Sequence, residues 1–153
     1  MAMTAAETGH LVLGTLHTTG AVKTIDRIID ALPIEEREQT KSFLSQSLIA
    51  VVTQVLCKTV DHQGRRAVCE VMVMTKAIAK LIQTDQSHQI PSQVQMGREF
   101  GMQLMDQALV AAVQAKEVDP DHAYSFANDK CMLQKFVTDT SVMPKLDPPM
   151  AGS

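Results

Sequence analysis

The chain has 153 residues, of which 45% are hydrophobic, and it carries a formal net charge of -3. A chain of this length forms one domain by default, and such a domain buries roughly 70% of its unfolded surface. The acidic balance disfavours a nucleic-acid-binding protein, because phosphate binding needs clustered Lys and Arg side chains and the few aromatic residues offer little surface for base stacking.

The first twenty residues predict the end of a helix followed by a strand. Residues 1–8 fit the last turns of a helix, and Gly9 suits a left-handed cap. The run from His10 to Leu16 predicts an apolar strand of the type that is buried on both faces of a sheet. Because ligands sit at the carboxyl ends of strands in open α/β sheets, His17 and Thr18 fall at a candidate binding edge.

Two helices are predicted next. In residues 22–32 an apolar residue recurs every three or four positions with charged residues between them, and Pro33 ends this amphipathic helix. A second helix begins near Glu35, where several acidic side chains favour the positive end of the backbone dipole. It gives way to a β-branched run near Ile49.

A β-hairpin is predicted from two β-branched runs, residues 49–58 and 66–74, which bracket a polar loop centred near Gln63. This centre pairs Cys57 with Cys69 across the hairpin. The register puts one apolar face on the core, formed by Ile49, Val51, Val55, Cys57, Ala67, Cys69, Val71 and Val73. The opposite face is mixed and carries Gln54, Lys58 and Glu70.

Helical periodicity returns after the hairpin. An apolar stripe over residues 77–82 predicts one helix, and the sequence Ile-Pro-Ser at 90–92 predicts the start of another. A longer stripe runs from Phe100 to Val113, and the acidic, proline-containing start at 119–121 opens a last helix.

The pattern as a whole predicts an α/β fold. Residues 1–74 hold the strands, 75–137 form a helical subdomain, and 138–153 form a disordered tail with several prolines. The three cysteines are odd in number and lack C-x-x-C spacing, which favours reduced thiols in a cytoplasm. No apolar stretch reaches the length of about 20 residues that a membrane span needs.

Few residues are candidates for chemistry. His17 at the end of a core strand would donate a hydrogen bond to a γ-phosphate oxygen, or would only cap the strand. His10 lies about 23 Å away along an extended strand, so it would instead order the turn or reach an interface. Arg27, beside Asp26 and Asp30, belongs to a solvated charged face or meets a partner subunit. No set of side chains has metal-ligand spacing, so no metal site is predicted.

Four segments, in the same order and spacing, resemble motifs of the secretion ATPases that drive type IV pili. These are residues 8–19, 24–30, 88–92, and 100–103 with 105–107. The chain is most similar to the retraction branch, the PilT family of twitching motility ATPases, over roughly residues 1 to 118. This resemblance implies the C-terminal part of a RecA-like P-loop ATPase core, containing a strand and a β-hairpin, followed by a helical C-terminal subdomain.

The resemblance also implies a function and a set of roles. The family forms cytoplasmic homo-hexamers at the inner-membrane pilus base that use ATP with Mg²⁺ to withdraw pilin subunits. The implied partners are an inner-membrane platform protein of the pilus and a paralogous retraction ATPase. His17 occupies the position of the family's phosphate-contacting histidine, Thr18 would bind the nucleotide, and His10 and Arg27 would order the chain or lie at a subunit interface.

The sequence departs from the family pattern in two places. It contains neither a Gly-rich Walker A loop ending in Lys-Ser/Thr nor an acidic Walker B strand, so we expect the C-terminal portion of a longer protein that neither binds ATP tightly nor hydrolyses it alone. In retraction ATPases one helix carries two Arg residues and a Glu, and at the matching positions this chain has Ala79, Gln83 and Thr84. The alternatives are a non-catalytic interaction module of the same family, or a pilus-extension or type II secretion ATPase, although those usually carry a four-cysteine zinc insertion.

Overall fold

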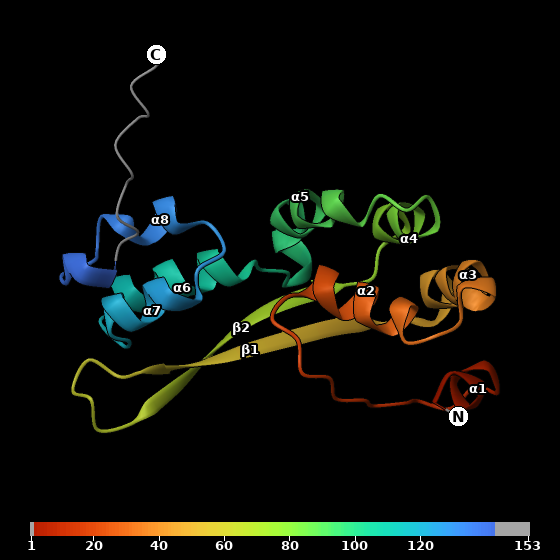
Figure 1. The fold of residues 1–153 in the computed structure, drawn as a ribbon, viewed down its shortest axis with the longest axis horizontal. Coiled ribbons are helices and arrows are strands. Elements are labelled where there is room, and N and C mark those ends of the chain that lie inside the picture. The colour runs from red at the N-terminus through yellow and green to blue at the C-terminus, as the bar shows by residue number, and fades with distance from the viewer. Residues whose placement is uncertain (1, 143–153) are drawn as a thin grey trace, which may run out of the picture.

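A long antiparallel hairpin forms the centre of the fold, and helices cover one of its faces. The computed structural model describes residues 2–142. Figure 1 shows α2 to α5 gathered at the open end of the hairpin and α6 to α8 nearer its turn. In chain order the elements are α1 (Ala2–Glu7), α2 (Ala21–Asp30), α3 (Arg37–Ser47), β1 (Ala50–Lys58), β2 (Arg65–Val73), α4 (Lys76–Gln83), α5 (Ile90–Met96), α6 (Met105–Gln114), α7 (Pro120–Phe126) and α8 (Lys130–Gln134), with short 3-10 turns at Ile34–Glu36, Ser87–Gln89, Gly97–Phe100 and Thr140–Val142.

The turn of the hairpin lies earlier than predicted. The Thr59 N–H donates to the Gly64 carbonyl at 3.1 Å, so the turn is centred between Asp61 and His62 rather than at Gln63. The Asp61 carboxylate accepts hydrogen bonds from the Thr59 hydroxyl and the Gln63 N–H, and His62 takes the left-handed conformation with φ 55°. This local bonding closes the loop and fixes which residues of the two strands face each other.

The earlier turn shifts every cross-strand pair. Cys57 faces Arg66, so the predicted pairing of Cys57 with Cys69 is wrong. In the observed register Thr53 faces Glu70. The observed pairing differs from the predicted one by an odd number of residues. Since side chains alternate along a strand, the side chains of β2 that were predicted to point outward face the helices, and those predicted to face the helices point outward. The face that packs against the helices consists of Val51, Thr53, Val55 and Cys57 of β1 with Val68, Glu70 and Met72 of β2.

Two apolar clusters share this inner face. At the open end, Val51 and Met72 pack with side chains of α2, α3, α4 and α5, including the fully buried Ile25 and Ile78. Nearer the turn, Val55, Cys57 and Val68 pack with α6, α7 and α8. One hairpin therefore supports both groups of helices. The division of the chain at residue 74 stays a prediction.

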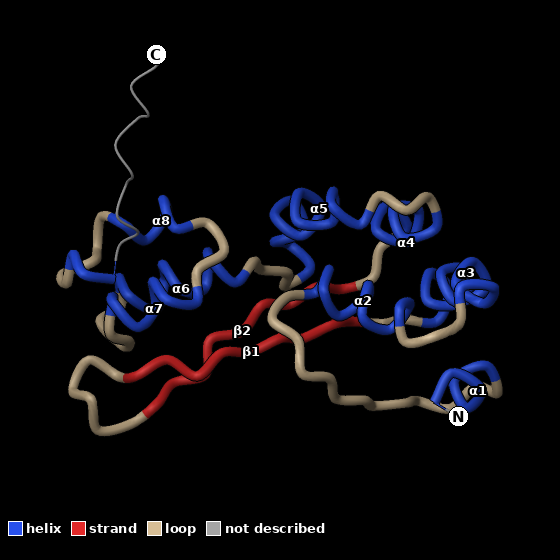
Figure 2. The backbone as a smooth tube through the Cα atoms, viewed as in Figure 1, coloured by secondary structure: helices blue, strands red, loops and turns tan. Residues whose placement is uncertain are grey.

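The predicted strand at His10–Leu16 is wrong. These residues belong to no strand in the described chain, and Figure 2 shows the stretch between α1 and α2 as a long loop. The side chains of Leu11 and Leu13 are 76% and 90% exposed, not buried. A strand needs a neighbouring strand to take its backbone hydrogen bonds, and no other part of residues 2–142 lies against this segment in a ladder.

The ends of the predicted helices depend on their local caps. Gly9 has φ 86°, and the His10 N–H donates to the Ala5 carbonyl, so α1 ends in the predicted left-handed cap. The stripe predicted to start at Phe100 starts instead at Met105, because Gly101 at φ 77° ends a separate turn and Phe100 is 61% exposed.

Near the end of the described chain, two features differ from the expected plan. The short helix α8 was not predicted; Asp129 caps it by accepting a hydrogen bond from Cys131 N–H. The Thr138 and Asp139 N–H groups donate to the Asp121 carboxylate, and a short turn follows at Thr140–Val142. Residues 143–153 of the predicted tail lie outside the described residues.

We expect Leu109→Ala to lower the free energy of unfolding by about 2–5 kcal/mol, because Leu109 is fully buried in the cluster nearer the turn. The matched control is Leu13→Ala, which removes the same atoms from a side chain 90% exposed and should change it by less than about 0.5 kcal/mol. Urea unfolding followed by circular dichroism measures both. Equal losses in the two variants would contradict this assignment of the core.

Candidate functional site

The residues that the sequence singled out around His17 lie on the loop that leads into α2. Thr24 donates its hydroxyl proton to the Gly20 carbonyl at 2.9 Å, so at 2.7 Å its oxygen accepts a hydrogen bond from the Thr18 hydroxyl. Gly20 has φ 120°, a conformation that side chains strongly disfavour. The His17 side chain is exposed just before this anchored turn. The loop therefore holds the backbone at Thr18 and leaves the imidazole accessible.

His10 and Arg27 are not brought together with His17 by any hydrogen bond or ion pair among the described residues. The ring of His10 shares a hydrogen bond of 3.0 Å with the hydroxyl of Thr8, at the end of α1. Arg27 is exposed on α2, and Asp30 pairs with Arg37 at 3.1 Å instead. The His10 ring therefore contacts the end of α1, and among the described residues Arg27 forms no ion pair with Asp26 or Asp30.

Glu70 on β2 is a residue that the sequence analysis missed. It is 7% exposed, and its two carboxylate oxygens accept hydrogen bonds from two helix starts: Ala21 N–H at 2.6 Å and Met105 N–H at 3.1 Å. The expectation that Glu70 lies on the outer, mixed face is wrong, because it depended on a hairpin turn centred at Gln63, whereas the observed turn lies earlier. A usable signal was present, since Glu70 is the only charged residue in the apolar run from Ala67 to Met74.

A cavity of about 230 Å³ opens beside Glu70, between the starts of α2 and α6 and the side of α5. Its walls are mainly apolar, with several polar side chains among the lining residues. The lining residues include Thr19, Lys23, Val94, Leu104, Asp106 and Asn128. The cavity is continuous with the anchored turn, so the exposed end of the His17 segment and the buried carboxylate belong to one region.

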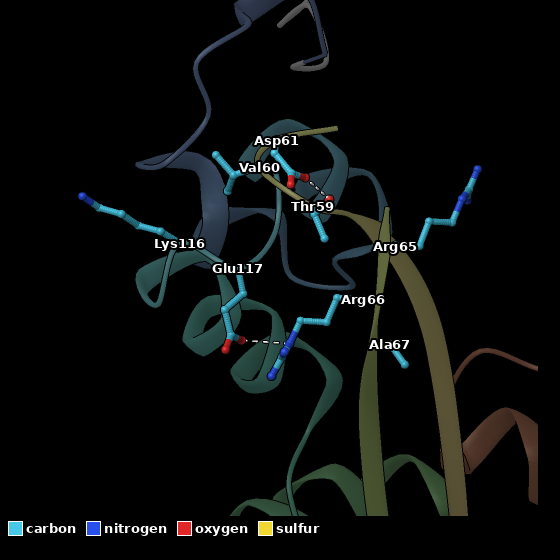
Figure 3. Close-up of a pocket in the computed structure, with 8 residues that line it drawn as sticks. All are labelled: Thr59, Val60, Asp61, Arg65, Arg66, Ala67, Lys116 and Glu117. Atoms are coloured by element: carbon cyan, nitrogen blue, oxygen red, sulfur yellow. Dashed lines mark hydrogen bonds and ion pairs between the residues drawn. The ribbon is translucent and has the colours of Figure 1, made fainter. Parts of the chain in front are cut away.

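A second hollow lies at the tip of the hairpin (Figure 3) and is an open surface of charged side chains. Arg66 points toward Glu117 and pairs with it at 2.8 Å, whereas Arg65 and Lys116 point away. No group of three or more His, Cys, Asp or Glu residues in the described chain is arranged to hold a metal ion. The tip therefore offers paired surface charges and no arrangement of nucleophile and base.

His122 of α7 lies against the hairpin near this tip. Its Nδ1 accepts a hydrogen bond from Lys58 N–H at 3.1 Å. Partial burial, followed by the positive charges of Lys58 and Arg65, lowers the pKa of His122 below its ordinary value of about 6.5. Nδ1 can accept the Lys58 N–H only when it carries no proton, and the lowered pKa favours this neutral form of the ring.

Comparison with known proteins identifies the family. Residues 1–120 match the family described as Type II/IV secretion system protein. The chain belongs to this family. A twitching motility protein of Neisseria gonorrhoeae is 50% identical over 123 residues, which cover 80% of this chain and 33% of that protein. A protein of Pseudomonas aeruginosa named "Type IV pilus retractation ATPase PilT" is 50% identical over 113 residues, covering 74% of this chain and 33% of its own length.

Solved structures of secretion ATPases agree with this assignment. The crystal structure of the pilus retraction motor PilT with bound ADP matches with a TM-score of 0.77 and 34% identity, covering 88% of this chain and 37% of that one. The ATPase DotB of Legionella pneumophila shares the fold, with a TM-score of 0.66 at 24% identity over 80% of this chain and 33% of that one. The resemblance to the PilT branch and the predicted α/β fold class are therefore confirmed.

The chain spans about a third of the length of the curated relatives that it matches. Within residues 2–142, no helix is long and apolar enough to cross a membrane. Neither finding tests the roles predicted for His17, Thr18, His10 and Arg27, which stay predictions.

We expect the stability of the chain to fall as the pH drops below about 6.5. The folded pKa of His122 is lower than the unfolded one, so between the two values the unfolded state binds more protons and acidification favours unfolding. His122→Asn, which keeps an acceptor for Lys58 N–H but does not titrate, should reduce the change in unfolding free energy between pH 7.5 and 5.5. The exposed His88 provides the control: His88→Asn should keep the wild-type profile. An unchanged profile in His122→Asn would show that this histidine does not cause the acid sensitivity.

Proposed function

We propose that the chain acts as part of an ATP-driven motor for type IV pilus retraction and twitching motility. In this motor, His17 contacts the γ-phosphate of ATP. The observation that carries the proposal is the place of His17: an exposed imidazole at the end of an extended apolar segment, directly before the anchored start of α2. The names of relatives at 50% identity, a twitching motility protein and a retraction ATPase, supply the activity.

The local structure suits a phosphate contact. The Thr18 hydroxyl is bound to Thr24, so the backbone next to His17 is held while the ring projects outward. An imidazole N–H then donates to a phosphate oxygen that is present in ATP and absent after hydrolysis, which makes its position dependent on the nucleotide. The hydroxyl proton of Thr18 already goes to Thr24, so the Thr18 backbone N–H would add the second donor to the nucleotide. ATP with Mg²⁺ would be held mainly by residues outside this chain, in the rest of the protein.

The exposed leucines of the same segment support a larger assembly. Leu11 and Leu13 expose most of their surface, although an apolar run of this kind is typical of a buried strand. In the whole motor the segment would pair as a strand of the ATPase sheet, with further chain on both sides. The motor would be a homo-hexamer at the cytoplasmic side of the inner membrane, working on the platform protein of the pilus base and alongside a paralogous retraction ATPase.

We expect the purified chain to release no phosphate from ATP and Mg²⁺ above the blank. The phosphate-holding loop and the carboxylate that activates water have no counterpart in its sequence. A colorimetric phosphate assay measures this. Turnover that disappears in His17→Ala would contradict the proposal that catalysis needs the rest of the motor.

The role of His17 requires the complete ATPase. We would replace the matched region of the Pseudomonas aeruginosa relative with this chain and measure ATP hydrolysis. His17→Ala should lower kcat by about 10²- to 10³-fold, the usual effect of removing one preorganised donor to developing charge. His88→Ala, at another exposed histidine, should stay near the parent rate. A fusion that assembles and hydrolyses ATP equally well with and without His17 would exclude the phosphate contact, and a fusion that assembles without hydrolysing ATP would favour a non-catalytic module.

A further inference from the structure

We infer that Glu70 is a positioning residue that couples the His17 turn to the C-terminal helices. Its carboxylate joins the first residue of α2 to the first residue of α6, so that a displacement of one helix start is transmitted to the other. The use of this coupling in nucleotide sensing rests on the function proposed above. The coupling itself is a property of this chain and is tested without nucleotide.

The geometry around Glu70 leaves little freedom. Both oxygens are occupied by backbone N–H groups, at 2.6 Å from Ala21 and 3.1 Å from Met105. These N–H groups have no partner inside their own helices, because the first turn of a helix leaves its donors unsatisfied. The carboxylate is 7% exposed, and water cannot easily replace either contact. Movement of one helix start therefore either moves the carboxylate or breaks a charge-assisted hydrogen bond.

On the α2 side, the coupling begins at the residues next to His17. The Thr18 hydroxyl binds Thr24, which binds the Gly20 carbonyl, and Ala21 follows directly. A change at His17 that moves Thr18 therefore acts on the turn that supplies the Ala21 N–H. Gly20, at φ 120°, joins the loop to the helix in a conformation that glycine adopts readily and other residues do not.

On the α6 side, the contacts continue into the C-terminal part of the chain. Asp106 follows Met105 and accepts hydrogen bonds from Asn128 and Asp129 N–H at 2.8 and 2.9 Å. Asp129 in turn caps α8. A path of hydrogen bonds, joined by the peptide links Gly20–Ala21 and Met105–Asp106, thus runs from Thr18 to the start of α8. Glu70 is the member of this path that spans the two groups of helices.

The first test uses the wild-type chain and detects the two hydrogen bonds directly. We would measure scalar couplings across hydrogen bonds by NMR, from the amide nitrogens of Ala21 and Met105 to the carboxyl carbon of Glu70. Couplings from both amides are expected. The absence of either coupling would overturn the proposal, and no substitution is needed.

The second test asks whether a disturbance is transmitted. Thr18→Ala removes the hydroxyl that holds the turn, and we expect amide hydrogen exchange to speed up by about 5- to 30-fold at Ala21 and also at Met105, the range for losing 1–2 kcal/mol. In a Glu70→Gln background, where the amide group offers only one acceptor oxygen, Thr18→Ala should no longer affect Met105. A merely structural Glu70 would not produce this dependence on background.

The matched control is Thr75→Ala, which removes the hydroxyl that caps α4 by accepting a hydrogen bond from Ile78 N–H at 3.2 Å. It should speed exchange near Ile78 and leave Met105 unchanged. The proposal is overturned if Thr18→Ala affects Met105 equally in both backgrounds or in neither, or if Thr75→Ala has the same effect. If Glu70→Gln does not fold, the comparison of Thr18→Ala with Thr75→Ala in the wild-type background, together with the scalar couplings, decides. Since no ATP is involved, failure here leaves the motor proposal standing, and failure of the ATPase experiment leaves the coupling intact.

Discussion

The fold depends on the register of one hairpin. The bonds of Thr59, Asp61 and Gly64 close the turn and set which residues of β2 face the helices. With this register a single strip of side chains serves both apolar clusters, and Glu70 stands between Val68 and Met72 at the point where the clusters meet. A slip by one residue would turn Glu70 to the outer face and bring its apolar neighbours inward, so both helix starts would lose their acceptor.

A buried carboxylate in the middle of an apolar strip destabilises the folded state unless its charge is compensated. In proteins generally, removing an ionised group from water costs several kcal/mol even after the surrounding structure has relaxed. Here the compensation comes from two backbone N–H donors and from the positive ends of the dipoles of α2 and α6. The same arrangement satisfies donors that would otherwise be buried without partners. The carboxylate thus requires the two N–H donors, and the buried donors require the carboxylate. This mutual requirement explains why the starts of two helices distant in sequence lie next to one strand.

Much of the fold was predictable because its signals are local. The periodicity of Ile25 and Ile29 identified α2, and the proline and acidic residues at 119–121 identified the start of α7, where Asp119 accepts the His122 N–H. The turn centre was displaced because the sequence shows a polar loop without showing which of its residues close the bond. That error hid Glu70, although an isolated charge in an apolar strand was visible. The short helix α8 has too few residues to show a period.

The strand predicted at His10–Leu16 failed for a different reason. An apolar pattern indicates the preference of a segment for an extended backbone, and Figure 2 shows residues 10–18 as a drawn-out loop. A ladder also needs a neighbouring strand, which a local pattern does not specify. The segment is nevertheless held at both ends, by the cap of α1 at Gly9 and by the bonds of Thr18 at α2. Between these anchors, no hydrogen bond of the described chain fixes residues 11–17. The end nearest His17 is the one joined to Glu70, so a force on the imidazole is applied at the anchored end of the segment, where the structure connects it to both groups of helices.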